Sequence, residues 1–133
     1  MKKKELSRVY YLSKEIKMWE EQLELLECKT RGRALKITGM PFAPRGGAGD
    51  EMAEIIADRV DILAIIEKKT IELEAEQKKI IKWIMEIDDT FIRQIMVYRH
   101  VRCYTWEQVA KKLDTSAESI RKYHDRFLKK YCE

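Results

Sequence analysis

The sequence predicts an all-α protein, in which a long antiparallel, coiled-coil-like helical hairpin is followed by a C-terminal helix-turn-helix bundle. The 133 residues include only five glycines and two prolines, so few positions resist a helical backbone. Apolar side chains recur at alternating spacings of three and four residues before residue 88, and two helix-start signals follow after residue 104. We therefore divide the chain into a hairpin over residues 1–87, expected to mediate oligomerisation, and a bundle over residues 88–133.

The first helix is expected from about Lys4 to Leu35. Its apolar positions occupy the a and d sites of three successive heptads, which is typical of a helix that pairs along one seam. These positions are Val9, Leu12, Ile16, Trp19, Leu23, Leu26 and Thr30. Charged residues lie between them and predict a solvated outer face.

Residues 39–49 interrupt this pattern. They contain both prolines and four of the five glycines, so the sequence predicts a flexible connector that holds no helix. A glycine-rich loop can also bind phosphate, but the pattern G-x-x-x-x-G-K-[ST] is missing. The connector is therefore the favoured interpretation.

The second helix is expected from an N-cap at Asp50 to Ile87. Its a/d positions are interrupted by Arg59 and Gln77 and comprise Met52, Ile56, Leu63, Ile66, Thr70, Leu73, Ile80, Ile84 and Ile87. The apolar stripe is widened beyond one seam by Ile55, Ile62, Ile65, Ile81 and Met85. A stripe wider than one seam has a second flank to cover, so we expect a homo-oligomer, most simply a homodimer.

The C-terminal segment contains several short helices. Asp88, Asp89 and Thr90 offer capping side chains for the first of them, whose apolar set is Phe91, Ile92, Ile95, Met96 and Val101. The stretch Thr105-Trp-Glu-Gln108 is a capping box that starts a helix bearing Val109, Ala110 and Leu113. A second box is expected over Thr115–Glu118, so that a tight turn separates two short helices.

The faces of the last helix follow from its periodicity. Ile120, Tyr123 and Phe127 are expected to point inward. The outward positions near its N-terminus are then Ala117, Glu118, Arg121 and Lys122. Arginine can bind guanine with two hydrogen bonds, glutamate can accept one from cytosine, and alanine can contact a thymine methyl group.

Charge is distributed unevenly along the chain. Residues 90–133 carry ten Lys and Arg against five Asp and Glu, a net charge of +5, whereas residues 51–89 have a net charge of −5. Candidate phosphate contacts are Arg126, Lys129, Lys130, Lys111, Lys112, Arg99 and Arg102. Such charges can also be the solvated face of an ordinary helical bundle. Together with the capped helix pair, they favour double-stranded DNA as the partner.

The segment Ile95–Ala110, continued by Leu113 and residues 116–128, resembles region 4 of bacterial sigma factors over about a third of the chain. The whole chain resembles small phage and prophage proteins of Gram-positive bacteria, which are similar to phage late-gene transcription activators. The residues that carry this broader likeness are Met40-Pro41, the glycines up to Gly49, and Thr105-Trp106-Glu107. The resemblance implies a sequence-specific DNA-binding transcriptional regulator.

Two departures from the sigma-factor pattern matter. Cys103 replaces the glycine of the family's turn, which must therefore avoid the left-handed conformation or tolerate strain. Ala117 and Ser119 stand where primary sigma factors tend to carry arginine, so recognition of an ordinary −35 promoter element is not expected.

Two other functions remain open. The chain could be a protein-interaction module that binds RNA polymerase, or a phage DNA-packaging protein similar to small terminase subunits. DNA binding should weaken steeply as salt rises, whereas an apolar protein interface should not.

Catalysis and metal binding are not expected. His100 and His124 lie far apart in sequence, and the cysteines at positions 28, 103 and 132 do not have zinc-ligand spacing. Glu67, Glu72, Glu74 and Glu76 have the pattern of a solvated helix face. We expect no enzyme, no catalytic residues and no cofactor.

The expected location is the cytoplasm, with reduced thiols and without membrane contact. The longest uncharged apolar run, residues 62–66, is far shorter than the roughly 20 residues that a bilayer span needs. No apolar stretch follows the basic N-terminus, so no signal peptide is expected.

Overall fold

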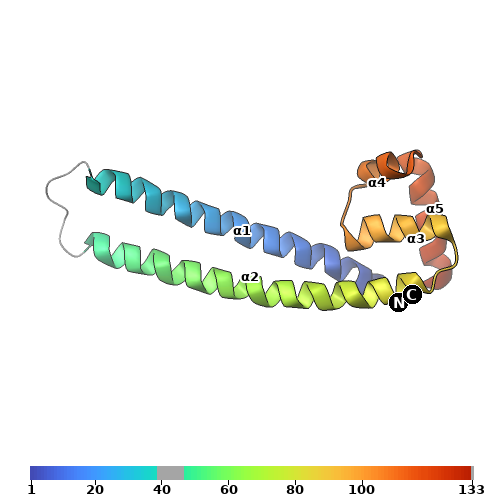
Figure 1. Cartoon of the computed structure of the whole chain (residues 1–133), viewed down its shortest axis with the longest axis horizontal. Coiled ribbons are helices and arrows are strands. Elements are labelled where there is room, and N and C mark those ends of the chain that lie inside the picture. Colours follow the sequence, from blue (N-terminus) through green and yellow to red (C-terminus); the bar gives the residue numbers. More distant parts are fainter. Residues whose placement is uncertain (39–46, 133) are drawn as a thin grey trace. The chain divides into compact units, whose positions relative to one another are not determined.

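A computed structural model describes residues 1–38 and 47–132, and every regular element in these ranges is helical (Figure 1). The elements are α1 (Lys3–Thr38), α2 (Gly47–Met85), α3 (Thr90–Met96), the π-helix η1 (Val97–Val101), α4 (Trp106–Leu113) and α5 (Ala117–Tyr131). The predicted all-α class is therefore confirmed. Within the described ranges, none of the helices combines the length and apolar character that crossing a membrane requires.

The connector between the long helices differs from the prediction. Residues 39–46, and with them Met40, Pro41 and Pro44, lie outside the described residues. The prediction was wrong for residues 47–49, because α2 already begins at Gly47. Asp50 consequently lies within the first turn and is not the N-cap. Extending an existing helix adds one hydrogen bond per residue, which can offset the roughly 1 kcal/mol that a helical glycine costs relative to alanine.

The chain forms two compact units. The unit that we call the terminal unit combines Met1–Lys14 with Ile71–Glu133, and the middle unit comprises Glu15–Thr70. Each long helix contributes to both units. The division after residue 87 that the sequence pattern suggested stays a prediction.

The core of the terminal unit is built from five helices. Val9 of α1, Val109 of α4 and Ile120 of α5 are fully buried. The buried apolar residues of this core cluster are Leu6, Val9, Ile80, Ile84, Ile92, Ile95, Met96, Val109 and Ile120, and Leu12 of α1 is buried as well. Side chains near both ends of the described sequence thus share one core with the end of α2.

Polar side chains of α2 also join this unit. Glu76 was expected on a solvated face, but it is only 8% exposed, and its Oε1 lies 3.3 Å from Nη1 of Arg8 in α1. The neighbouring Gln77 donates a hydrogen bond of 3.2 Å from Nε2 to the carbonyl of Val101. The prediction for Glu76 was wrong because the apolar packing of α1 turns this face of α2 toward Arg8.

The middle unit is an antiparallel helix pair. Glu15 of α1 lies 3.8 Å from Lys69 of α2, and Glu27 lies 3.2 Å from Arg59, so residue numbers rise along one helix as they fall along the other. The expected α1 seam is confirmed in its described part, where Ile16, Trp19, Leu23 and Leu26 are half-buried.

The α2 seam of the middle unit matches the expected register at Ile66 and Thr70, which are half-buried, but departs from it nearer the start of the helix. Ile56 and Leu63 were expected inside, but they are 56% and 48% exposed, whereas Ile55 is 7% exposed. The inner face instead passes through Ile55, Arg59 and Ile62. Arg59, which the sequence pattern treated as an interruption, lies on this face because Glu27 provides its ion pair.

Candidate nucleic-acid interface

The start of α4 is fixed by side-chain capping. The Thr105 hydroxyl accepts a hydrogen bond of 3.3 Å from the Gln108 N–H, and Oε1 of Gln108 accepts one of 2.9 Å from the Thr105 N–H. This confirms the predicted capping box, in which two otherwise unpaired donors are satisfied. The helix ends at Asp114, which adopts the left-handed conformation with φ 51° and donates its N–H to the Ala110 carbonyl.

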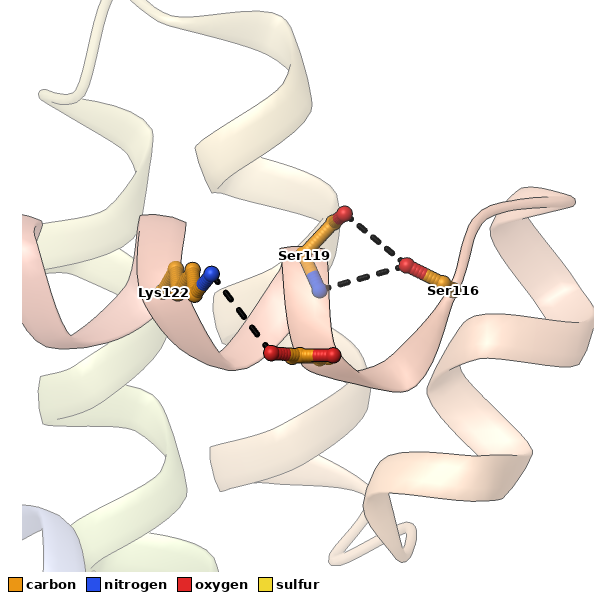
Figure 2. Close-up of polar contacts among 4 residues, drawn as sticks. Ser116, Ser119 and Lys122 are labelled. Atoms are coloured by element: carbon orange, nitrogen blue, oxygen red, sulfur yellow. Dashed lines mark hydrogen bonds and ion pairs between the residues drawn. The ribbon is translucent and has the colours of Figure 1, made fainter.

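The start of α5 is capped one residue later than predicted. Ser116 Oγ accepts a hydrogen bond of 3.3 Å from the Ser119 N–H, and the two hydroxyl oxygens lie 2.8 Å apart (Figure 2). The left-handed Asp114 leaves Thr115 in the turn, where its hydroxyl donates to the Leu113 carbonyl at 3.0 Å. Ser116 is thus the first extended residue before the helix, and the predicted box over Thr115–Glu118 is wrong.

The inward face of α5 also differs from the prediction at one position. Ile120 is fully buried and Phe127 is half-buried, as expected. Tyr123 was expected inside, but it is 50% exposed and its ring meets the edge of Phe91 at a centroid distance of 5.3 Å. His124, which is 5% exposed, occupies the buried position one turn after Ile120.

The proposed base-reading residues lie in the first two turns of α5. Glu118, Arg121 and Lys122 are exposed, whereas Ala117 is half-buried. Lys122 Nζ lies 3.5 Å from a carboxylate oxygen of Glu118, as the dashed line from Lys122 in Figure 2 indicates. Both side chains remain largely in solvent, and exposed pairs contribute at most about 1 kcal/mol, so a ligand can separate them at little cost.

The proposed phosphate contacts are distributed over two helices. Lys111 and Lys112 are exposed in the last turn of α4, and Arg126, Lys129 and Lys130 are exposed in the later part of α5. Arg102 is exposed as well, with its guanidinium 5.2 Å from the ring of Tyr98. These side chains are accessible to a polyanion.

Arg99, another candidate for phosphate contact, is engaged within the fold. Its Nη1 donates to the Tyr104 carbonyl at 2.9 Å, and its guanidinium lies 4.4 Å from the ring of Trp106. Arg99 therefore supports the segment between η1 and α4, which makes it a poorer candidate than Arg102.

The turn after η1 resolves the question raised by Cys103. This residue has φ 56°, so the replacement of glycine is accommodated by a left-handed cysteine. The Arg102 N–H bonds to the Val97 carbonyl, and the Tyr104 N–H bonds to the Tyr98 carbonyl, both at 3.0 Å. These bonds keep the strained residue in place. Burial raises the pKa of the Cys103 thiol, so this thiol stays protonated at neutral pH.

A pair of histidines is the main feature that the sequence did not reveal. Nε2 of His100 in η1 and Nε2 of His124 in α5 lie 2.7 Å apart, and the rings stack with centroids 5.0 Å apart. The edge of Trp106 from α4 packs on His124 at a centroid distance of 4.8 Å. The only sequence signal was the spacing of four residues from Ile120 to His124, which places both on one helix face.

Burial lowers the pKa of both histidines. For His100, burial acts together with the charges of His124 and Arg99 and lowers the pKa to about 3. For His124, burial outweighs the opposing hydrogen bond and charge of Asp125. Both rings are therefore neutral at pH 7. Among the described residues, no group of three or more His, Cys, Asp and Glu side chains could hold a metal ion.

Comparison with known proteins adds no relative. The chain matches no protein-family model, no curated protein and no solved structure. The likeness to sigma-factor region 4 therefore rests on the residues quoted above and stays a prediction.

Proposed function

We propose that this protein is a sequence-specific DNA-binding transcriptional regulator of phage or prophage type, in which a helical hairpin precedes a sigma-region-4-like helix-turn-helix formed by α4 and α5. The main support for this proposal is the pattern of buried and exposed side chains in α4 and α5. The tightly connected pair α4–α5 buries Val109 and Ile120 while the first two turns of α5 expose Glu118, Arg121 and Lys122. In helix-turn-helix proteins, base contacts come from this part of the second helix.

The chemistry of the exposed side chains suits recognition of a duplex. Arg121 could bind guanine through two hydrogen bonds, and Glu118 could accept one from cytosine once its pair with Lys122 opens. Ala117 is small enough to contact a thymine methyl group. Phosphate contacts would come from the exposed basic residues of both helices, which are Lys111, Lys112, Lys122, Arg126 and Lys129.

A homodimer is part of the proposal. In α2 of the middle unit, Ile56, Val60 and Leu63 are 56%, 61% and 48% exposed and recur at i, i+4 and i+7. Leu25 of α1 is also 58% exposed. A continuous apolar helix face of this kind favours association with a second copy. Dimeric helix-turn-helix proteins bind paired half-sites about one helical turn apart.

A protein-interaction module that binds RNA polymerase is the second candidate, and one observation favours it. A groove between the end of α2 and the α3–η1 segment is lined by residues that include Ile81, Met85, Val97, Arg93 and Arg102. Met85 is 65% exposed. An apolar helix with acidic flanks would suit such a groove.

The decisive experiment is recovery of bound fragments from sheared host and phage DNA by the purified protein, followed by titration of the recovered fragment. We expect enrichment of one sequence and an affinity that falls steeply between 50 and about 200 mM salt, because bound counterions are released. If no sequence is enriched at any salt concentration, the DNA-binding proposal is wrong and the polymerase interaction becomes the leading candidate.

The role of Arg121 is tested on the recovered fragment with a matched control. Arg121→Ala should weaken binding by roughly 1–3 kcal/mol and relax specificity at one base pair. Lys79→Ala removes an equal charge from an exposed position of α2, and we expect it to bind normally. Equal affinities of the two variants, with both folds intact, would contradict base reading by Arg121.

A further inference from the structure

We propose that His100 and His124 form a pH-sensitive latch, which holds α5 against η1 while both rings are neutral and releases it on acidification. The latch joins two elements that are separated in sequence by α4. It is independent of the proposed function.

The hydrogen-bond partners assign the neutral tautomers. Nδ1 of His124 lies 3.2 Å from a carboxylate oxygen of Asp125. A carboxylate accepts hydrogen bonds, so the proton of neutral His124 resides on Nδ1 and its Nε2 accepts. Nε2 of His100, 2.7 Å away, must then carry a proton and donate. The hydrogen bond between the two Nε2 atoms forms only when one of them carries a proton and the other does not.

In a pair that stayed closed, added protons would remove this complementarity. One added proton charges one ring, and a hydrogen bond survives only if the other ring still accepts through Nε2. A second proton places two N–H groups at 2.7 Å and two positive charges in stacked rings. The closed pair therefore cannot hold both protons.

The surroundings of the pair do not relieve this repulsion. From η1, the guanidinium of Arg99 adds positive charge. From α5, Asp125 opposes it, but 75% of the Asp125 side chain is exposed, so solvent screens its charge. From α4, the contact is the uncharged ring of Trp106. Burial and positive charge thus outweigh the single carboxylate.

The direction and size of the pH effect follow from linkage. A released histidine titrates near 6.5, whereas the pKa of closed His100 is about 3. Between pH 6.5 and pH 3, the released state therefore binds more protons than the closed state. The closed latch becomes less stable as the pH falls below 6.5. Between pH 7.5 and 5, His100 alone should raise the ratio of open to closed latch by about 30-fold. His124 adds to this in the same direction.

The experiment uses the whole chain, whose only two histidines are the latch itself. Imidazole ¹⁵N NMR between pH 7.5 and 4.5 should record one proton on Nδ1 of His124 and one on Nε2 of His100 at the upper end. On acidification both rings should become protonated together, at the pH where the backbone amides of α5 change. Independent titration of both rings near 6.5, with unchanged α5 amides, would overturn the proposal.

Substitution provides the control. Glutamine carries an uncharged amide near the position of Nε2, so the double variant His100→Gln, His124→Gln should lose less stability than wild type between pH 7 and 5. The single variant His100→Gln serves the same purpose if the double variant does not fold, because His124 can still accept from an amide. Equal losses in wild type and His100→Gln would also overturn the latch.

Discussion

The terminal and middle units use the same two long helices but bury them to different degrees. In the terminal unit, α1 and α2 receive side chains from α3, α4 and α5, and Val9, Ile95 and Ile120 are completely buried. In the middle unit, α1 and α2 have only each other, and Ile55 is the one apolar side chain that counts as buried among those described. A two-helix pair leaves one flank of each helix uncovered, whatever its helix propensity.

The difference in burial assigns folding stability mainly to the terminal unit and association mainly to the middle unit. The terminal unit has the larger buried core, whereas in the middle unit Ile56 and Val60 belong to an exposed apolar face of α2. We therefore expect substitutions in the first unit to change unfolding free energy, and substitutions in the second to change the oligomeric state. The following substitutions test this division.

The largest effect is expected for Ile120→Ala in the terminal unit. Ile120 is fully buried where α5 meets the other helices, and removing such a side chain leaves a cavity that costs about 2–5 kcal/mol of unfolding free energy. Urea denaturation followed by circular dichroism measures it. The control Ile71→Ala alters a side chain that is 62% exposed, and it should change the unfolding free energy by less than about 0.5 kcal/mol.

The second effect concerns the middle unit. Replacing Ile56 and Val60 with aspartate puts charge on the exposed apolar face, so a homodimer should dissociate at least about tenfold more readily, equivalent to about 1.4 kcal/mol. Sedimentation at micromolar concentrations measures this change. The control Ala57→Asp adds charge at an exposed position beside this face. A wild-type protein that sediments as a monomer would contradict the dimer.

A smaller effect is expected at the start of α5. Ser116→Ala removes the acceptor for the Ser119 N–H and should lower the unfolding free energy by about 1 kcal/mol. Thr115→Ala removes only the hydrogen bond to the Leu113 carbonyl and should have a smaller effect. The opposite ranking would restore Thr115 as the cap.

The smallest effect is expected for the ion pair of the middle unit. Glu27→Gln removes the charge that faces Arg59 across a distance of 3.2 Å, where both side chains are more than a third exposed. Such pairs contribute about 0–1 kcal/mol, and the thermal midpoint should move by no more than a few degrees. A loss comparable to that of Ile120→Ala would indicate that Arg59 is far more deeply buried in an assembly.

The success of the sequence-based predictions depends on the range of the interactions involved. The Thr105–Gln108 capping box and the burial of Ile120 were predictable because both follow from spacing within one turn or one helix. The cap at Ser116 and the exposure of Tyr123 were not, because the left-handed Asp114 and the packing of Phe91 determine them. The inward position of Arg59 in the middle unit was not predictable either, because its ion-pair partner Glu27 lies on the other helix.

The histidine pair is a further contact between residues that lie far apart in sequence. His100 and His124 are 24 residues apart, and the chain between them includes the left-handed Cys103, which follows η1, and the whole of α4. The spacing of apolar residues along the sequence does not predict a contact between these two rings. The roles of the exposed side chains in DNA binding are likewise a matter of chemistry with a partner, and they stay predictions.

The core of the terminal unit also has a consequence for synthesis on the ribosome. Leu6 and Val9 are synthesised about 100 residues before Val109 and Ile120, the α4 and α5 side chains that share their core. During that interval the apolar face of the nascent α1 has no completed core to enter, and exposed apolar surface of this kind promotes aggregation. We therefore expect the nascent chain to depend on chaperones or on early pairing with α2, and a chain interrupted before α5 to be recognised as misfolded.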